Sequence, residues 1–182
     1  MNKQQTIAFT GHRPESLPFG ENEKSAGCAW LKEMLRSEVM DRASQGYEVF
    51  YCGAARGSDI LFGEQVLQVR NTVYPAIRLI CVIPHENQAE NWPESWRDRY
   101  FHLLEQANDE VLISMRYTRG CYHQRNRYMV DHAGALLAVY NGTSKGGTAY
   151  TVEYARSRAK EIVILDPSTL ERIFIPPSLM VL

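Results

Sequence analysis

The stretch Ala135-Leu-Leu-Ala-Val-Tyr-Asn-Gly-Thr-Ser-Lys-Gly-Gly-Thr148 decides the fold of this chain. It begins as an apolar run, continues as a polar glycine-rich loop, and leads into a helical pattern over 149–159. A strand, a glycine-rich loop and a helix start in this order are typical of a phosphate-binding cradle. Gly146 and Gly147 let the backbone approach an anion, and Thr148 can cap the helix and also reach that anion. Taken by itself, the glycine pair also fits a simple turn.

The segment just upstream favours the cradle. Residues 123–132, His-Gln-Arg-Asn-Arg-Tyr-Met-Val-Asp-His, predict a helix that places Arg125 and Asn126 at its beginning. Two earlier loops also follow predicted strands and carry glycine and arginine, namely Gly-His-Arg-Pro at 11–14 and Cys-Gly-Ala-Ala-Arg-Gly-Ser-Asp at 52–59. Every unusual loop of the chain therefore follows a strand.

Strands and helices alternate along the whole chain. Apolar or β-branched runs predict strands at 6–10, 47–52, 77–83, 110–115, 162–165 and within 135–148. Three- and four-residue spacings predict helices at about 23–44, 60–69, 96–107, 123–132 and 149–159. Residues 170–175 fit a short edge strand or a clasp over the core. This order predicts an α/β fold: a single Rossmann-like, doubly wound, mostly parallel sheet with helices on both faces. In such sheets, ligands bind at the carboxyl ends of the strands.

Size and charge narrow the functional classes. The 182 residues (20.8 kDa) are most simply one domain over 1–182, with 166–182 as a C-terminal tail. The net charge of −1 argues against a dedicated nucleic-acid binder. Without a signal peptide or an apolar run of membrane-spanning length, we expect a cytoplasmic protein with no membrane partner. Phe174, Leu179 and Val181 can cover either a homo-oligomer interface or the protein's own core.

The four cysteines predict no metal site. Cys28, Cys52, Cys81 and Cys121 form no C-x-x-C pair and have no histidine at ligand spacing. Cys52 and Cys81 stand in apolar strand runs, so we expect both thiols to be buried. No metal cofactor is expected, and the expected small-molecule ligand is derived from a nucleotide.

Taken together, the motifs resemble the SLOG superfamily, which links DNA-processing protein A to the LOG-type phosphoribohydrolases. The chain is most similar to the YpsA-like bacterial family within it. The resemblance rests on 11–14, 52–59, Arg-Asn-Arg at 125–127 and Gly-Gly-Thr at 146–148, in that order, and it spans nearly the whole chain. It implies a Rossmann-like nucleotide-binding domain.

The loops together predict one ligand site. Glycine backbones, guanidinium groups and helix N-termini all stabilise phosphate oxygens. Asp59 can accept a hydrogen bond from a ribose hydroxyl, although Asp59 or Ser58 can also simply cap a helix. Trp92, in a loop, is the candidate for stacking on a base, whereas Trp96 and Tyr100 are expected in the core. The expected ligand-binding residues are Gly11, His12, Arg13, Gly53, Arg56, Gly57, Ser58, Asp59, Arg125, Asn126, Gly146, Gly147 and Thr148.

Three functions follow from the resemblance. The preferred one is a sensor or regulatory module that binds a nucleotide or nucleotide-sugar such as an ADP-ribose or NAD derivative. The first alternative is a LOG-type N-glycosidic hydrolase of nucleoside monophosphates, which needs a carboxylate near the anomeric carbon. Thr151 stands where the LOG pattern has its glutamate, so Glu64, Glu86, Glu153 and His12 are the substitute catalytic candidates. The second alternative is binding of single-stranded DNA, as in DNA-processing protein A.

Overall fold

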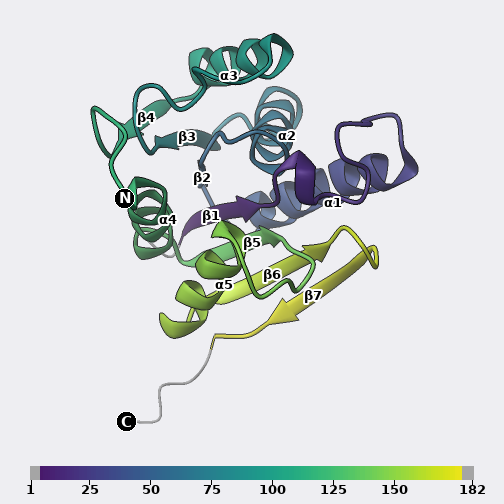
Figure 1. Ribbon diagram of the computed structural model, residues 1–182. Coiled ribbons are helices and arrows are strands. Elements are labelled where there is room, and N and C mark those ends of the chain that lie inside the picture. The colour runs from purple at the N-terminus through teal and green to yellow at the C-terminus, as the bar shows by residue number, and fades with distance from the viewer. Residues whose placement is uncertain (1–4, 178–182) are drawn as a thin grey trace.

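The computed structural model describes residues 5–177, so Leu179 and Val181 of the apolar tail lie outside the described residues. The fold is a seven-stranded sheet in the order β4-β3-β2-β1-β5-β6-β7 (Figure 1). All neighbouring strands are parallel except β6 and β7, which are antiparallel. The strands are β1 (Thr6–Gly11), β2 (Val49–Cys52), β3 (Arg78–Ile83), β4 (Asp109–Leu112), β5 (Ala135–Val139), β6 (Glu161–Asp166) and β7 (Glu171–Ile175).

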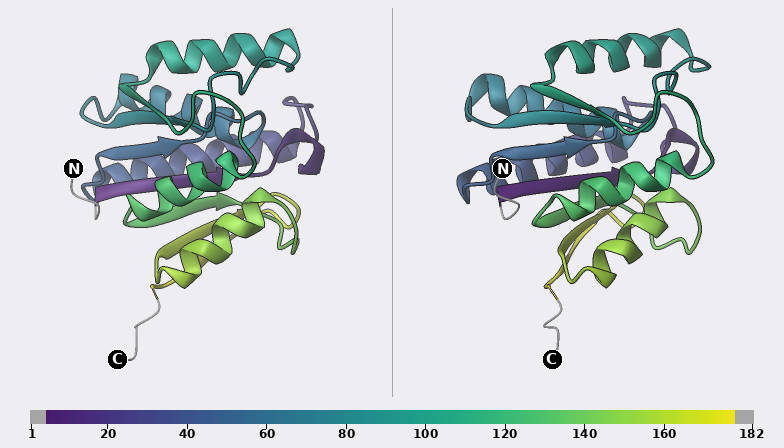
Figure 2. Two further views of the ribbon diagram at one scale, coloured as in Figure 1. Left: turned by 60° about the vertical axis from the view of Figure 1, so that its left-hand side comes forward. Right: turned by 90° about the vertical axis from the view of Figure 1, so that its left-hand side faces the viewer.

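Helices cover both faces of the sheet, as predicted. The two views of Figure 2 show α4 and α5 together on one side and α1 and α2 on the other. The helices are α1 (Ala26–Ser44), α2 (Ser58–Thr72), α3 (Glu94–Gln106), α4 (Cys121–Asp131) and α5 (Gly147–Ser157), with a short 3-10 turn η2 (Pro14–Ser16) after β1. The predicted α/β class and the Rossmann-like arrangement are confirmed.

Helix starts differ from the sequence prediction for local reasons. Helix α1 begins at Ala26 rather than near residue 23, because Ser25 is the N-cap and its Oγ accepts the Cys28 N–H at 3.1 Å. Helix α5 begins at Gly147, with Gly146 as the N-cap at φ 103°. The prediction that Thr148 caps α5 is therefore wrong. Glycine tolerates the positive φ at position 146, so the helix begins at Gly147, two residues before the predicted start at residue 149. Thr148 lies within the first turn instead.

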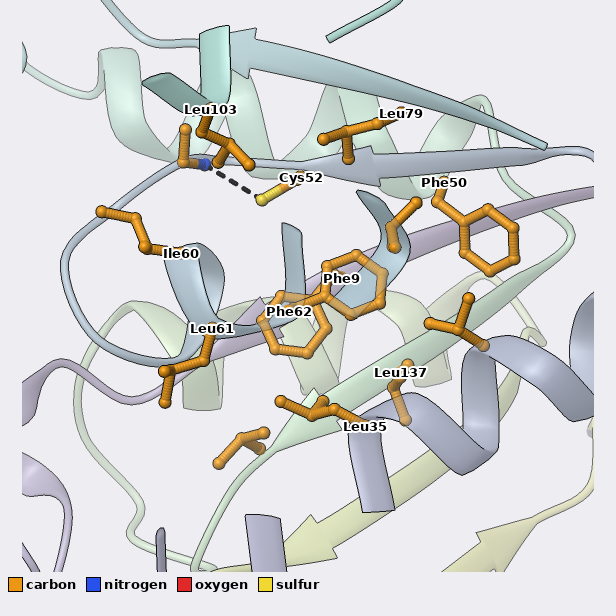
Figure 3. Close-up of a cluster of buried hydrophobic side chains, with 14 of the residues drawn as sticks. Phe9, Leu35, Phe50, Cys52, Ile60, Leu61, Phe62, Leu79, Leu103 and Leu137 are labelled. Atoms are coloured by element: carbon orange, nitrogen blue, oxygen red, sulfur yellow. Dashed lines mark hydrogen bonds between the residues drawn. The ribbon is translucent and has the colours of Figure 1, made fainter. Parts of the chain in front are cut away.

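Two apolar clusters hold the layers together, one on each face. The larger lies between the sheet and α1, α2 and α3, and Phe9 and Phe62 stack in it with ring centroids 4.2 Å apart (Figure 3). The smaller packs Met129, Val130 and Val152 of α4 and α5 against the opposite face. Successive strand residues such as Ala8 and Phe9 enter different clusters, since side chains alternate across a strand. Each fully buried large side chain contributes about 1.5–3 kcal/mol.

The strands next to β1 are buried, and the sheet edges are exposed. Cys52 and Cys81 are fully buried, as predicted, and Trp96 and Tyr100 belong to the larger cluster. Strand β7 is the exposed antiparallel edge, which resolves 170–175 as an edge strand. Arg172 of β7 forms an ion pair with the buried Glu38 of α1, which links this edge strand to the helix. None of the helices within 5–177 is long and apolar enough to cross a membrane.

Candidate functional site

The order in which the chain adds strands to the sheet reverses between β1 and β5. From β1 the chain proceeds through β2, β3 and β4 toward one edge, and from β5 it proceeds through β6 and β7 toward the other. Loops that leave two such neighbouring strands separate and open a crevice at their carboxyl ends. A cavity of about 310 Å³ lies at this position.

The cavity is built from four segments that are distant in sequence. They are the end of β1 with its loop, the start of α2, the first turns of α4, and the start of α5. The lining residues are Thr10, Gly11, Arg13, Ala55, Asp59, Tyr122, His123, Arg125, Asn126, Gly147 and Thr148. Three helices thus begin at one cavity, and their dipoles all place partial positive charge there.

Arg125 is the buried cation of this cavity. Its side chain is 5% exposed, and Nη1 donates a 2.6 Å hydrogen bond to the carbonyl oxygen of Gly53. Its Nε has no hydrogen-bond partner among residues 5–177. Burial lowers the pKa of Arg125, while the carboxylate of Asp59 opposes that shift. A buried donor without a partner is costly, so this nitrogen favours an acceptor that is brought by water or by a ligand.

Asp59 is the carboxylate that lines the cavity, at the first turn of α2. Burial raises the pKa of Asp59, and the guanidinium charges of Arg125 and Arg13 lower it. The backbone N–H groups of Ala55 and Gly53 also lower the pKa of Asp59, because they favour its charged form. Two arginines and one carboxylate leave the cavity with an excess of positive charge when all three are ionised.

The glycine loop before α5 leaves the cavity open on one side. A Cβ built on Gly146 or Gly147 would meet no heavy atom of another described residue within 4 Å, chain neighbours aside. The contrast with Gly11 is sharp, because a Cβ there would lie 2.5 Å from Cβ of Ser58. Gly11 is therefore required for packing, whereas the glycine pair leaves free space beside the helix N-terminus, where an anion is best stabilised.

His12 lies behind the cavity lining and connects three loops. Its Nε2 is 2.8 Å from Oδ1 of Asn141, and its carbonyl oxygen accepts the Ser58 Oγ–H at 2.9 Å. Burial lowers the pKa of His12, and the hydrogen bond with Asn141 partly restores it. The imidazole is 6% exposed. These contacts support a structural role, and a catalytic role for His12 stays a prediction.

The structure brings seven of the thirteen expected ligand residues to the cavity lining. These are Gly11, Arg13, Asp59, Arg125, Asn126, Gly147 and Thr148. Gly53, Gly57, Ser58 and His12 support the lining from behind: a Cβ on Gly57 would lie 2.8 Å from the His12 carbonyl oxygen. Arg56 pairs with Glu15, and Gly146 borders a neighbouring cavity.

The remaining candidates lie away from this lining. Trp92 packs edge-on against Tyr100 with centroids 5.4 Å apart, and the Arg13 guanidinium lies 5.9 Å from its ring centroid. Glu64 forms a two-point ion pair with Arg99, at 2.7 and 2.8 Å. Glu86 borders a different cavity beside α3. Base stacking by Trp92 and catalysis by either glutamate remain predictions.

Sequence reasoning missed Thr10, Ala55, Tyr122 and His123 in the lining. Tyr122 and His123 precede the Arg-Asn-Arg motif by two or three residues, and α4 begins at Cys121, earlier than predicted. Both residues lie on the first turn of α4, next to the Arg-Asn-Arg motif, and this closeness to the motif was the sequence signal that could have identified them. Within 5–177, no group of three or more histidine, cysteine, aspartate or glutamate side chains is arranged to hold a metal ion.

Comparison with protein families gives one match over most of the chain. Residues 7–170 match the YspA SLOG family. A UPF0398 protein of Halalkalibacterium halodurans, BH1768, is 27% identical over 176 residues, covering 93% of this chain and 92% of that protein. A UPF0398 protein of Bacillus cereus strain G9842 is 28% identical over 159 residues, covering 86% of this chain and 85% of that protein.

Among solved structures, the fold is similar to that of DNA processing protein A from Helicobacter pylori, a structure described for its single-stranded DNA binding mode. The TM-score is 0.58 at 18% identity, and the match covers 88% of this chain. It covers 65% of the Helicobacter chain, which is thus the longer protein. At 18% identity, this similarity shows a shared fold.

Proposed function

The chain belongs to the YspA SLOG family, and on that premise we propose that its cavity binds the phosphate of a nucleotide or nucleotide-sugar. Compounds of the ADP-ribose and NAD class are the expected ligands. The protein acts as a cytoplasmic sensor or regulatory module that changes partner or state when the ligand is bound. Neither a metal nor a second cofactor is part of this proposal.

The observation that carries the proposal is the position of Arg125. The Nε of this buried arginine has no hydrogen-bond partner in the described part of the chain, and the cavity that Arg125 lines is also bordered by the open start of α5 at Gly147. A phosphate there accepts hydrogen bonds from the guanidinium and from first-turn N–H groups, which have no carbonyl partner within the helix. Arg13 adds a second positive charge from the loop after β1.

Hydrolysis of a nucleotide is the alternative, and Thr151 weighs against the LOG route. Thr151 is 1% exposed; its Oγ1 accepts a 2.7 Å hydrogen bond from Asn126 Nδ2 and donates one of 2.7 Å to the Gly147 carbonyl oxygen. A side chain that joins α4 to α5 thus occupies the position of the LOG glutamate. Asp59 is the carboxylate that lines this cavity, so it joins the catalytic candidates for hydrolysis there.

Thermal unfolding with separate ligands tests the proposal. The protein is heated with AMP, ADP-ribose, NAD, ribose 5-phosphate or a short single-stranded DNA, and each sample is then analysed for free base and ribose phosphate. A ligand at 100 times its dissociation constant adds about 2.7 kcal/mol, which shifts the unfolding midpoint by roughly 5–11 °C in a domain of this size. Stabilisation without products supports the sensor, and base release supports the hydrolase.

A matched pair of arginine variants locates the binding. Arg13→Gln removes a charge from the cavity lining, while Arg97→Gln removes one from an exposed position of α3. We expect Arg13→Gln to reduce the stabilisation by the nucleotide and Arg97→Gln to leave it unchanged. Stabilisation by DNA alone, lost with rising salt, would replace the proposal with the DNA-binding alternative.

A further inference from the structure

A second cavity, of about 610 Å³, lies beside the first turn of α5. It is lined by Tyr140, Gly142, Ser144, Gly146, Ala149, Tyr150, Glu153 and Arg156. Gly147 and Thr148 line the first cavity, so each residue of the short segment 146–150 lines one cavity or the other. Residues that line the two cavities are therefore immediate neighbours in sequence at the start of α5.

At Gly146 and Gly147 the backbone between the two cavities carries no side chain. Neither Gly146 nor Gly147 would bring a Cβ within 4 Å of another described residue, chain neighbours aside. Any larger residue there would project into this free space. Gly146 also adopts φ 103°, a conformation in which an L-residue is strained. The glycine pair thus leaves free space beside the backbone where the two linings meet.

The side chain of Tyr150 lines the second cavity and is fixed there by contacts with neighbouring side chains. Its ring centroid lies 4.1 Å from that of His123, and its hydroxyl accepts a hydrogen bond from Nε of Arg127. The Arg127 guanidinium is 5.5 Å from the Tyr150 ring centroid. Tyr154 stacks nearly parallel to Tyr150, at 6.3 Å and 5°. An aromatic side chain already fixed by its neighbours loses little entropy when a base stacks on it.

The other lining residues suit a nucleoside. Tyr140 supplies a second aromatic ring, fixed by the hydrogen bond from its hydroxyl to the Thr143 carbonyl oxygen at 2.6 Å. Glu153 and Arg156 form an exposed ion pair of 3.0 Å at the rim. Their carboxylate and guanidinium offer an acceptor and donors to a base edge or to ribose hydroxyls. Aromatic walls with a few polar groups are typical of small-molecule sites.

We infer that this second cavity binds the base of the ligand whose phosphate occupies the first cavity, and that Tyr150 is the stacking residue. The inference rests on the proposed function and names its base-binding subsite. Trp92 is the competing candidate. It borders neither cavity.

Calorimetric titration of AMP and ribose 5-phosphate tests the inference, since the two differ by the base. Stacking on an aromatic side chain makes AMP bind about 5- to 150-fold more tightly than ribose 5-phosphate. In Tyr150→Leu we expect this ratio to approach one while ribose 5-phosphate binds as before. Tyr150→Phe keeps the ring and is expected to retain the ratio. Tyr117→Leu, an exposed tyrosine outside both cavities, is the control.

The outcomes separate the inference from the proposed function. If neither compound binds to the unaltered protein, the proposed function fails and the subsite fails with it. If both bind and Tyr150→Leu leaves the ratio unchanged, the inference alone is overturned. Photolabelling with 8-azido-AMP gives a second readout that needs no variant. Label on 140–156 supports the second cavity, and label on the peptide that contains Trp92 overturns it.

Discussion

Gly53 and Arg125 occupy one shared space at the end of β2. Nη1 of Arg125 donates a 2.6 Å hydrogen bond to the Gly53 carbonyl oxygen, and a Cβ on Gly53 would lie 1.6 Å from that nitrogen. The arginine comes from α4, on the opposite face of the sheet from α2. It reaches the loop between β2 and α2 because residue 53 has no side chain. The cavity therefore depends on a contact between segments 72 residues apart.

Gly53→Ala is expected to destabilise the protein and weaken ligand binding together. The new methyl group displaces a guanidinium that is 5% exposed and has little room to move. Overpacking of this kind costs about 1–3 kcal/mol in the free energy of unfolding. Urea denaturation measures the loss, and Gly27→Ala, where the nearest atom would be Phe19 Cδ1 at 3.3 Å, is the control. Equal stability of the two variants would contradict the shared space.

Gly147→Asp is expected to abolish phosphate binding and leave the fold intact. The added side chain has free space, and its negative charge stands where the phosphate is proposed to lie. Gly147→Asn has nearly the same shape without the charge, so it should bind more tightly than Gly147→Asp by about tenfold or more. Titration with ribose 5-phosphate compares them. Unchanged affinity in the aspartate variant would move the site elsewhere.

Thr151→Val is expected to loosen the contact between α4 and α5. The buried hydroxyl accepts the Asn126 amide hydrogen and donates to the Gly147 carbonyl oxygen, so valine leaves two polar groups without their partner. A buried unsatisfied group costs about 1–3 kcal/mol. Ser157→Ala, an exposed hydroxyl on the same helix, should change stability by less than about 0.5 kcal/mol. Denaturation midpoints that coincide would show that the network contributes nothing.

His12 is expected to make stability fall in mild acid. Its pKa is lowered by burial in the folded protein, whereas the unfolded chain takes up the proton near the ordinary histidine pKa of 6.5. Between these two pKa values the unfolded state binds more protons, so the free energy of unfolding falls as the pH falls, and the loss levels off below the folded pKa.

Replacing His12 tests this pH dependence. Between about pH 7.5 and pH 5.5, the free energy of unfolding should fall less in His12→Gln than in the unaltered protein. In the control His102→Gln, whose histidine is exposed, it should fall as much as in the unaltered protein. Denaturant unfolding at several pH values gives the slopes. A slope unchanged by His12→Gln would show that this imidazole does not sense pH.

The sequence by itself determined the order of strands and helices, the parallel sheet and the loops that carry the site. Apolar runs without alternation predict strands buried on both faces, and glycine or arginine after several of these runs predicts functional loops. These are local properties, and Gly11, Arg13, Arg125 and Gly147 could be assigned from them. The start of α5 could not, because it depends on the positive φ of Gly146 rather than on the capping ability of Thr148.

Only the tertiary structure decided which loop residues face the cavity and which stand behind it. Gly53 and Gly57 look alike in sequence to Gly147, yet a Cβ on the first two collides with neighbouring segments and a Cβ on the third does not. The same holds for Tyr150, whose position depends on His123 and Arg127 of another helix. The physical reason is that a side chain's surroundings come from strand order and helix packing. These bring distant residues together, and local spacing does not encode them.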